Sequence, residues 1–356
     1  MNCILFSKLD DAVEAKALVS TLNYKIIREY KIGEKNNPKY FISEDKIKQI
    51  NSDMPDVVVI FDTLKPRQLI NLSLQLKNIR ILDKIQLLLE IFALHAGAKE
   101  AKLQIELAKL KYEVPLLRDQ IRRSKLGEQQ GPFGGGKYEL EALLKYHKRR
   151  ISRLNNELQR IKTVTTLRLE KLKERGLPQV TILGYTNVGK TSIFNVLSGL
   201  NKKVDNSMFT TMSPKRASID INGAKAVLVD SVGFIMSIPP QIIEAFHVTL
   251  SEAKFSDALI LVIDASSDIQ IFTKMFMGSI NIMRQIGLSG KPLLLLLNKI
   301  DITRDIDVKI RKAKELIQNK YEPVIGIVPV SAKTKQNISS VREHLSQALD
   351  IKKYIY

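Results

Sequence analysis

The segment Gly184-Tyr-Thr-Asn-Val-Gly-Lys-Thr191 decides the fold of the C-terminal half of the chain. It matches the phosphate-binding pattern G-x-x-x-x-G-K-[ST], and it lies between an apolar run at 180–183 and a helix-forming run at 192–200. Its glycines let backbone N–H groups surround phosphate oxygens, while the N-terminus of the following helix adds positive potential. The predicted nucleotide-binding residues here are Gly184, Tyr185, Thr186, Asn187, Val188, Gly189, Lys190, Thr191 and Ser192.

A second motif, Asp230-Ser-Val-Gly233, follows the apolar run 226–229 and completes a metal-assisted phosphate site. The Lys190 ammonium can reach the β- and γ-phosphates, and the Thr191 hydroxyl can coordinate Mg²⁺. Asp230 would hold a metal-bound water, and the Gly233 N–H would meet the γ-phosphate. We therefore predict Lys190 and Gly233 as catalytic groups, with Thr191 and Asp230 (through water) as metal ligands.

A third motif, Asn298-Lys-Ile-Asp301, predicts selection of GTP over ATP. The Asp301 carboxylate can accept hydrogen bonds from N1–H and the N2 amino group of guanine, whereas adenine would leave that carboxylate unsatisfied. We expect Asn298 to tie this loop to the phosphate loop and the Lys299 stem to cover the base. A fourth motif, made of Ser331, Ala332 and Lys333, would supply a backbone N–H to guanine O6.

The spacing of strands and helices predicts three domains. Residues 178–356 alternate strand-like and helix-like runs, which predicts a mostly parallel sheet with helices on both faces. Residues 1–83 form a smaller α/β pattern without a catalytic constellation. Residues 84–177 carry two heptad seams, the first on one long helix at 84–114 that Pro115 ends or kinks. These seams predict an antiparallel two-helix coiled coil.

Net charge points to an anionic partner. The chain of 356 residues carries a formal charge of +19, and residues 84–177 contribute about half of that excess. The connection between the predicted helices, near 115–137, is glycine-rich and holds Arg118, Arg122, Arg123 and Lys125. This connection is a candidate probe for RNA, or else a simple spacer. We expect that replacing these four residues weakens RNA binding and spares GTP affinity.

Composition excludes several classes of protein. The chain has one cysteine, Cys3, so a disulfide framework and a thiolate zinc site are excluded, and a reducing cytoplasmic location fits. No apolar run is long enough for a membrane helix, so we expect no stable membrane insertion. We also expect no DNA partner and a monomeric state.

The four nucleotide motifs, in this order and spacing, resemble translation-factor-related P-loop GTPases. Phe209-Thr-Thr-Met-Ser-Pro214 and Asp230-Ser-Val-Gly-Phe234 resemble the two switches of the HflX family, in an archaeal-like variant. The resemblance implies that Phe209, Thr210 and Thr211 contact the nucleotide. It also implies that Thr211 coordinates Mg²⁺ and the γ-phosphate and acts in catalysis, with the adjacent Thr210 as the alternative.

The resemblance covers the whole chain, because HflX proteins have the same order of α/β half, coiled coil and GTPase domain. They bind the large ribosomal subunit and in bacteria take part in ribosome splitting or rescue, so an rRNA partner and a role in protein synthesis or ribosome biogenesis are implied. The family's Gly-Pro-Gly-Glu-Thr-Gln-Leu-Glu stretch is here Gly131-Pro-Phe-Gly-Gly-Gly-Lys-Tyr-Glu-Leu-Glu141. This longer form lacks the glutamine and any role that glutamine has.

Phe234 bears on the reaction. Ras-like enzymes place a water-orienting glutamine after Asp-x-x-Gly, but phenylalanine has no hydrogen-bonding group, so we predict packing for Phe234 and slow intrinsic hydrolysis. One alternative function is a nucleotide-gated RNA-binding or remodelling protein with little turnover. Another is a membrane-surface GTPase anchored by the basic helices.

Overall fold

The structure is a computed structural model. It describes residues 1–33, 36–125, 137–174, 177–200, 215–221, 223–231, 233–234, 252–318 and 320–350. The chain divides into two compact units, with the boundary between them in the sequence after Ile161, and each is described by itself. Within the described ranges, no helix combines the length and apolar character needed to cross a membrane.

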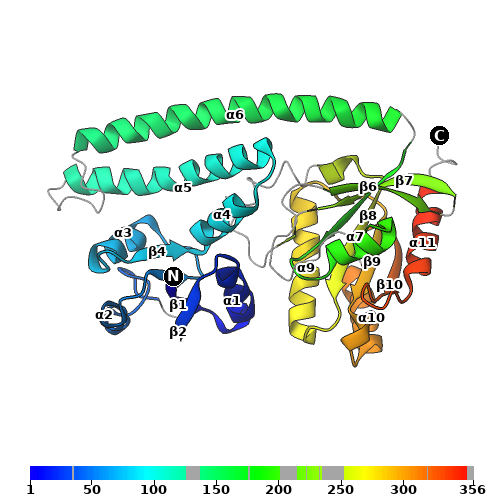
Figure 1. The fold of residues 1–356 in the computed structure, drawn as a ribbon, viewed down its shortest axis with the longest axis horizontal. Coiled ribbons are helices and arrows are strands. Elements are labelled where there is room, and N and C mark those ends of the chain that lie inside the picture. Colours follow the sequence, from blue (N-terminus) through cyan, green and yellow to red (C-terminus); the bar gives the residue numbers. More distant parts are fainter. Residues whose placement is uncertain are drawn as a thin grey trace. The chain divides into compact units, whose positions relative to one another are not determined.

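The N-terminal unit is built on a parallel sheet of order β2-β1-β3-β4 (Figure 1). The two central strands are β1, which is buried apart from its first residue, and β3, which is buried throughout. Both faces of the sheet are therefore covered. The strands are β1 (Asn2–Ser7), β2 (Lys25–Lys31), β3 (Val57–Ile60) and β4 (Arg80–Asp83). The helices are η1 (Leu9–Asp11), α1 (Ala12–Thr21), α2 (Glu44–Asp53), α3 (Pro66–Gln75) and α4 (Lys84–His95). The sequence pattern did not predict β2 and α2.

Two long helices, α5 (Lys99–Lys125) and α6 (Lys137–Glu174), follow this sheet. They are antiparallel, because Lys99 pairs with Glu157 while Glu106 pairs with Arg150 further along. Buried leucines of both helices pack together in the seam, namely Leu103, Leu110, Leu154 and Leu158. The predicted antiparallel helix pair is therefore confirmed.

The single helix predicted for residues 84–114 is wrong. The chain forms two helices there, α4 and α5, separated at residues 96–98, which include Gly97. Glycine is a poor helix former, and the long apolar run before it belongs to the sheet's cover. Pro115 does not end the helix, since it lies inside α5. Arg118, Arg122 and Arg123 are consequently helical residues of α5, and not part of an irregular connection.

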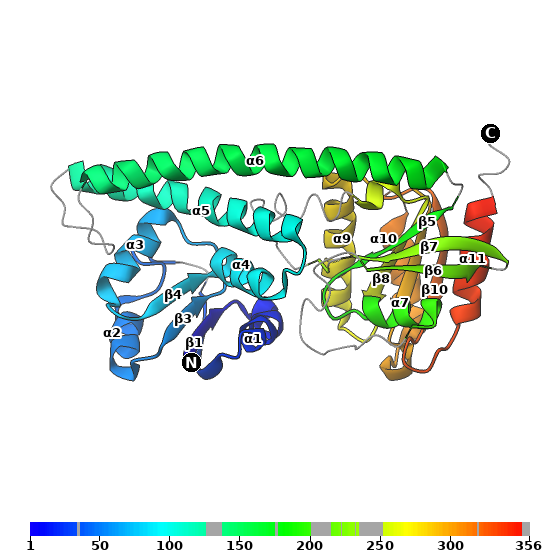
Figure 2. The ribbon, with the colours of Figure 1, turned by 45° about the horizontal axis from the view of Figure 1, so that its top comes forward.

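The second unit contains a six-stranded sheet of order β10-β9-β8-β5-β7-β6. All its neighbours are parallel except β6, which pairs antiparallel with β7 at the edge, so the predicted mostly parallel sheet is confirmed. Figures 1 and 2 show α9 and α11 on opposite sides of this sheet. The strands are β5 (Gln179–Gly184), β6 (Lys215–Ile221), β7 (Ala224–Asp230), β8 (Ala258–Asp264), β9 (Leu293–Asn298) and β10 (Val324–Pro329). The helices are α7 (Lys190–Ser198), η2 (Glu252–Phe255), α9 (Ile269–Gln285), η3 (Ile300–Ile302), α10 (Ile306–Ile317) and α11 (Ile338–Asp350).

The central strands of the second unit are buried along their whole length. Every residue of β5, β8 and β9 is buried, and Val, Ile and Leu make up most of them. Their carboxyl ends reach the same edge of the sheet, where β8 ends at Asp264 and β9 at Asn298. Ligands of open α/β sheets bind outside this edge. The fold thus gathers the sequence motifs in one place.

Candidate nucleotide-binding site

The loop between β5 and α7 has the backbone that a phosphate loop requires. Gly184 (φ 141°) and Gly189 (φ 95°) both lie in the left-handed region that favours glycine. A side chain would also collide at each position, with the carbonyl of Val262 at Gly184 and with the amide of Asn298 at Gly189. Gly189 directly precedes the first turn of α7, so the loop delivers its amides to a helix N-terminus.

Lys190 is the first residue of α7 and is buried. Its Nζ donates to the Tyr185 carbonyl oxygen of the same loop at 2.6 Å. Desolvation lowers the pKa of Lys190 to about 8, although the Asp230 carboxylate acts in the opposite direction. Gly233 lies beside this ammonium, since a Cβ on Gly233 would come within 2.8 Å of Nζ. The structure thus brings together two of the predicted catalytic groups.

Thr191 and Asp230 form a buried pair at the ends of α7 and β7. The Thr191 hydroxyl donates to Asp230 Oδ2 at 2.9 Å, and Asp230 is completely buried. A hydroxyl next to a carboxylate is a set of hard oxygen donors, which suits Mg²⁺ completed by water and phosphate oxygens. The described residues contain no group of three or more His, Cys, Asp or Glu side chains placed to hold a metal by themselves. The residues present therefore fit a nucleotide-linked magnesium ion.

Phe234 is held against the phosphate loop by its backbone and its ring. Its N–H donates to Gly184 O at 2.9 Å, and its carbonyl accepts from Thr186 N at 2.8 Å. The ring is buried and meets Tyr185 edge-on, with the centroids 6.0 Å apart. The predicted packing role of Phe234 is confirmed, and the chain after Asp230 is bound to the loop by backbone hydrogen bonds that sequence analysis could not foresee.

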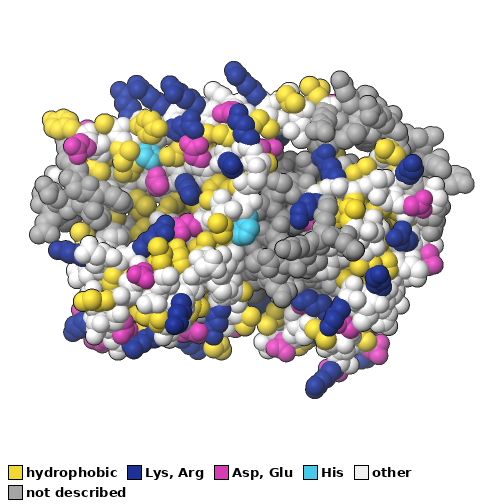
Figure 3. All heavy atoms as spheres, viewed as in Figure 1, with side chains coloured by type: hydrophobic (Ala, Val, Ile, Leu, Met, Phe, Trp, Pro, Cys, Tyr) yellow, Lys and Arg dark blue, Asp and Glu magenta, His cyan; other side chains and the backbone are white. Residues whose placement is uncertain are grey.

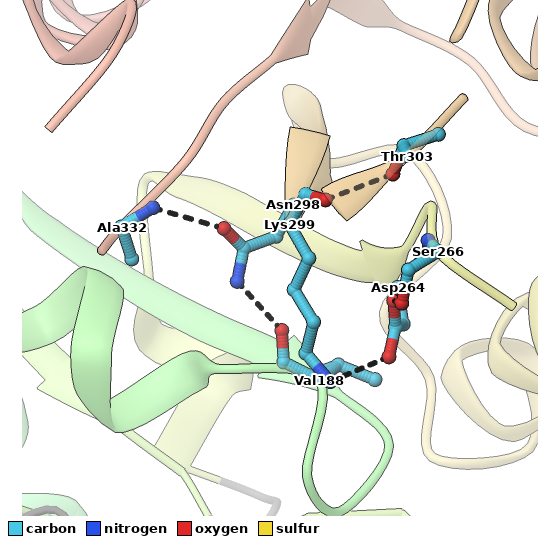
Figure 4. Close-up of polar contacts among 7 residues, drawn as sticks. All are labelled: Val188, Asp264, Ser266, Asn298, Lys299, Thr303 and Ala332. Atoms are coloured by element: carbon cyan, nitrogen blue, oxygen red, sulfur yellow. Dashed lines mark hydrogen bonds and ion pairs between the residues drawn. The ribbon is translucent and has the colours of Figure 1, made fainter. Parts of the chain in front are cut away.

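Asn298 ties its loop to the phosphate loop, as predicted, and also contacts the second base-recognition loop (Figure 4). Asn298 Nδ2 donates to Val188 O at 2.8 Å, and Asn298 Oδ1 accepts from Ala332 N at 3.1 Å. One buried asparagine therefore joins the phosphate loop to both base loops. The Ser331 hydroxyl donates to Asp301 Oδ1 at 2.8 Å, which orients the carboxylate predicted to read guanine.

Asp264, the last residue of β8, contacts the base-recognition loop although no sequence motif includes it. It caps the loop that follows β8, because Oδ1 accepts from Ser266 N at 2.9 Å. In addition, Oδ2 accepts from Lys299 Nζ at 2.6 Å, and Figure 4 shows the Lys299 side chain extended toward Asp264. The ion pair fixes the stem expected to cover the base. The signal available in the sequence was the position of Asp264 at the carboxyl end of a strand beside β9.

Several predicted site residues remain outside these contacts. Ser192 is half-buried on α7, and Lys333 is exposed after the last strand. Phe209, Thr210 and Thr211 lie outside the described residues, so the choice between the two threonines stays a prediction. Residues 131–136 of the divergent glycine-rich stretch lie outside them as well.

Three family models match the chain in succession. They are described as GTP-binding GTPase N-terminal over residues 10–93, GTP-binding GTPase Middle Region over 95–171, and 50S ribosome-binding GTPase over 179–299. The chain is 49% identical over 345 residues to "GTPase HflX" of Saccharolobus solfataricus (strain ATCC 35092 / DSM 1617 / JCM 11322 / P2), covering 96% of this chain and 97% of the relative. The chain belongs to the HflX family of GTPases.

Further relatives agree with this assignment. "GTPase HflX" of Hyperthermus butylicus (strain DSM 5456 / JCM 9403 / PLM1-5) is 37% identical, with 92% of this chain and 89% of the relative covered. A crystal structure of a GTP-binding protein from the hyperthermophilic archaeon Sulfolobus solfataricus in complex with GDP is 42% identical, with a TM-score of 0.57 and 98% of each chain covered. This HflX chain is therefore a P-loop GTPase that hydrolyses GTP.

Proposed function

We propose that this HflX chain is a Mg²⁺-dependent GTPase whose nucleotide state controls its association with the large ribosomal subunit. The matched family model carries the description 50S ribosome-binding GTPase, and it covers the phosphate loop, Asp230 and Asn298. The formal charge of +19 supports a polyanionic partner, because only a few cations are needed for the nucleotide itself. Protein synthesis, ribosome splitting or rescue, and ribosome biogenesis are the processes in which such a switch would act.

The observation that carries the GTP part of the proposal is the bond network around Asn298 and Asp301. Asn298 holds the phosphate loop and both base loops in one rigid arrangement, with donor–acceptor distances of 2.8 and 3.1 Å. Asp301 is oriented by Ser331, leaving its carboxylate edge to accept from guanine N1–H and N2. Adenine presents no matching donors, so ATP would leave a carboxylate unsatisfied.

The groups around Lys190 support hydrolysis by water attack on the γ-phosphate. The Lys190 ammonium and the loop amides would stabilise the negative charge that develops on the phosphoryl oxygens. Mg²⁺ held by Thr191 and, through water, by Asp230 would neutralise the β- and γ-phosphate oxygens. Gly233 N–H would contact the γ-phosphate, and Thr211 or Thr210 would close the site from the first switch.

Slow intrinsic turnover follows from Phe234. Its side chain is buried against Tyr185 and has no donor or acceptor, so it cannot orient the attacking water. Orientation is left to backbone groups, to another residue or to the partner. We therefore expect a large ribosomal subunit to raise kcat for GTP hydrolysis.

Sedimentation with separated ribosomal subunits tests the proposal. The full chain is mixed with each subunit in GDP or in a non-hydrolysable GTP analogue, and the bound fraction and the hydrolysis rate are measured. The expected result is binding to the large subunit in the GTP state, with release in GDP and faster hydrolysis. A hydrolysis rate unchanged by saturating subunits contradicts the proposal. Binding to any RNA in either nucleotide state supports the alternative, an RNA-binding or remodelling protein with little turnover.

A further inference from the structure

The outward face of α6 carries charge of one sign. Between Ala142 and Ile161 its exposed charged side chains are Lys145, Lys148, Arg149, Arg153 and Arg160, all positive. Their exposed neighbours in this stretch include the neutral hydrogen-bonding residues Ser152, Asn155, Asn156 and Gln159. Figure 3 shows dark blue Lys and Arg side chains gathered at the edge of the molecule where α6 runs in Figure 1.

This distribution differs from an ordinary solvated helix face. Exposed helices usually alternate both signs, which gains favourable i,i+4 pairs. Helix α10 does so, with exposed Asp307 and Glu315 among exposed Arg311 and Lys314. The one acid in the same stretch, Glu157, pairs across the hairpin with Lys99 and also interacts with Arg160 on its own helix. Between Ala142 and Ile161 the outward face thus carries exposed cations and no exposed acid.

The cations are also arranged along a line. Lys145, Arg149, Arg153 and Arg160 are separated by four, four and seven residues, so they share one side of the helix. At 1.5 Å rise per residue this row spans about 22 Å. Tyr138 precedes Lys145 by seven residues on the same side and is 83% exposed, while Tyr146 beside the row is 62% exposed.

We propose that the row Lys145, Arg149, Arg153 and Arg160 on α6, together with Lys148, Tyr138 and Tyr146, is a binding surface for structured RNA. The cations and neutral amides contact backbone phosphates, and the tyrosines stack on unpaired bases. A membrane surface fits poorly because the middle of this face is polar, whereas an interfacial helix needs an apolar side. This surface refines the partner contact and rests on the proposed function for its biological setting.

The surface also relocates the RNA contact that the sequence predicts near Arg118 to Lys125. Arg123 is committed within its own unit, because it donates to Asn71 Oδ1 at 2.7 Å and pairs with Asp119 at 2.9 Å. Its side chain is only 18% exposed. Arg118 and Arg122 remain exposed on α5, but α5 also exposes Glu113, so its charge is mixed.

The test is a quadruple substitution in the full chain, Lys145→Gln, Lys148→Gln, Arg149→Gln and Arg153→Gln. Glutamine keeps helix propensity and removes only the charge. The matched control is Arg284→Gln, Arg311→Gln, Lys314→Gln and Lys320→Gln, which removes two Arg and two Lys from exposed positions of the second unit. The probe is a fluorescent RNA hairpin with an unpaired loop, titrated at several salt concentrations. Far-ultraviolet circular dichroism and intrinsic GTP hydrolysis verify that each variant is folded.

We expect the α6 variant to bind the hairpin at least tenfold more weakly at 100 mM salt. Its slope of log affinity against log salt should shrink by up to about 3 to 4, because each lost phosphate contact contributes about 0.9. The control variant should stay within about twofold of the natural chain, since its residues lie outside the surface. Tyr146→Ser should weaken binding to the looped hairpin and leave a blunt RNA duplex unaffected. Equal losses of RNA affinity in the two quadruple variants overturn the proposal. It is also overturned if the α6 variant keeps its RNA binding but loses binding to phosphatidylserine vesicles or to polyglutamate.

Sedimentation with large subunits separates this inference from the proposed function. A chain that binds the subunit equally well with and without the four substitutions refutes the α6 surface and leaves the proposed function standing. A chain that binds the hairpin through α6 but never sediments with the large subunit supports the surface and refutes the ribosomal function.

Discussion

The molecule contains two parallel sheets, and both place a fully buried aspartate at the carboxyl end of a strand. In the N-terminal sheet Asp83 ends β4, and in the second sheet Asp230 ends β7. Asp83 accepts hydrogen bonds from Gln86 N at 2.9 Å, from the Tyr112 hydroxyl at 2.8 Å and from Leu64 N at 3.4 Å. Asp230 instead accepts from the Thr191 hydroxyl at 2.9 Å, a group suited to hold a metal ion.

The difference shows that topology alone does not make a site. Both sheets direct strand ends to one edge, but in the N-terminal unit that edge anchors helices. Asp83 caps α4 and binds Tyr112 of α5, so its lone pairs serve the fold. In the second unit the edge is bordered by a glycine loop too tight for side chains, a buried lysine and two base loops. The following predictions test whether the two edges differ as described.

The largest effect is expected for Asp301→Asn. The substitution removes the carboxylate that accepts two hydrogen bonds from guanine, each worth about 1.5–3 kcal/mol when one partner is charged. GTP affinity should therefore fall by at least about a hundredfold. Xanthine has a carbonyl in place of the N2 amino group, so the asparagine amide can donate to it and XTP binding should rise. Competition titrations with both nucleotides measure this, and unchanged GTP affinity would refute the assignment of Asp301.

Lys190→Met should separate activity from stability. Removing a donor that stabilises developing charge costs about 10²–10³-fold in kcat for GTP hydrolysis. The substitution also removes a buried cation whose pKa is lowered to about 8 by desolvation, so the nucleotide-free chain should gain a few °C in melting temperature. Single-turnover hydrolysis and thermal denaturation check the two halves. A variant that loses both activity and stability would mean that Lys190 is mainly structural.

Substitution of Asp83, at the carboxyl edge of the N-terminal sheet, should change the free energy of unfolding and not GTP hydrolysis. Burial raises the pKa of Asp83 to about 6, above its ordinary value near 3.9, so the folded state holds this proton more tightly than the unfolded state. The resulting stabilisation is complete below about pH 4 and is lost as pH rises through about 6, by an amount on the order of 3 kcal/mol. Asp83→Asn should abolish this part of the pH dependence of unfolding.

Tyr112→Phe is the companion to that measurement. It removes the hydroxyl donor to Asp83 and should destabilise the chain by about 1.5–3 kcal/mol, chiefly above pH 6 where the carboxylate is charged. Urea denaturation at pH 5 and 7.5 gives the comparison, and GTP hydrolysis by the folded protein should match the natural chain. Equal destabilisation at both pH values would show that packing of the ring, and not the hydrogen bond, anchors α5.

The sequence predicted features that depend on local motifs, and it missed features that depend on pairing between distant segments. The phosphate loop, Asp230 and the bond from Asn298 to the phosphate loop follow from motifs whose residues have one geometric role each, whereas the contact of Ser331 with Asp301 was not predicted. The exposed edge strands β2 and β6 escaped because they are mixed in polarity and their pairing partners set their conformation. The tie between Lys299 and Asp264 escaped because it joins two strands distant in sequence. The helix does not end at Pro115, one of the two predicted outcomes, because packing within the hairpin outweighs the local cost of proline.

The smallest effect is expected at Arg150 and Glu106, which join α5 to α6 by two hydrogen bonds of 2.7 and 2.9 Å. Both side chains are more than a third exposed, so solvent screens the pair and its coupling should be too small to shift the melting temperature measurably. A double-mutant cycle of Arg150→Gln and Glu106→Gln, followed by thermal denaturation at low and high salt, measures that coupling. If the coupling instead accounts for most of the loss of stability in the double mutant, polar pairs and not the leucine seam hold the hairpin together. In that case the stability of the glutamine variants of α6 would have to be compared with that of variants lacking the ion pairs between α5 and α6.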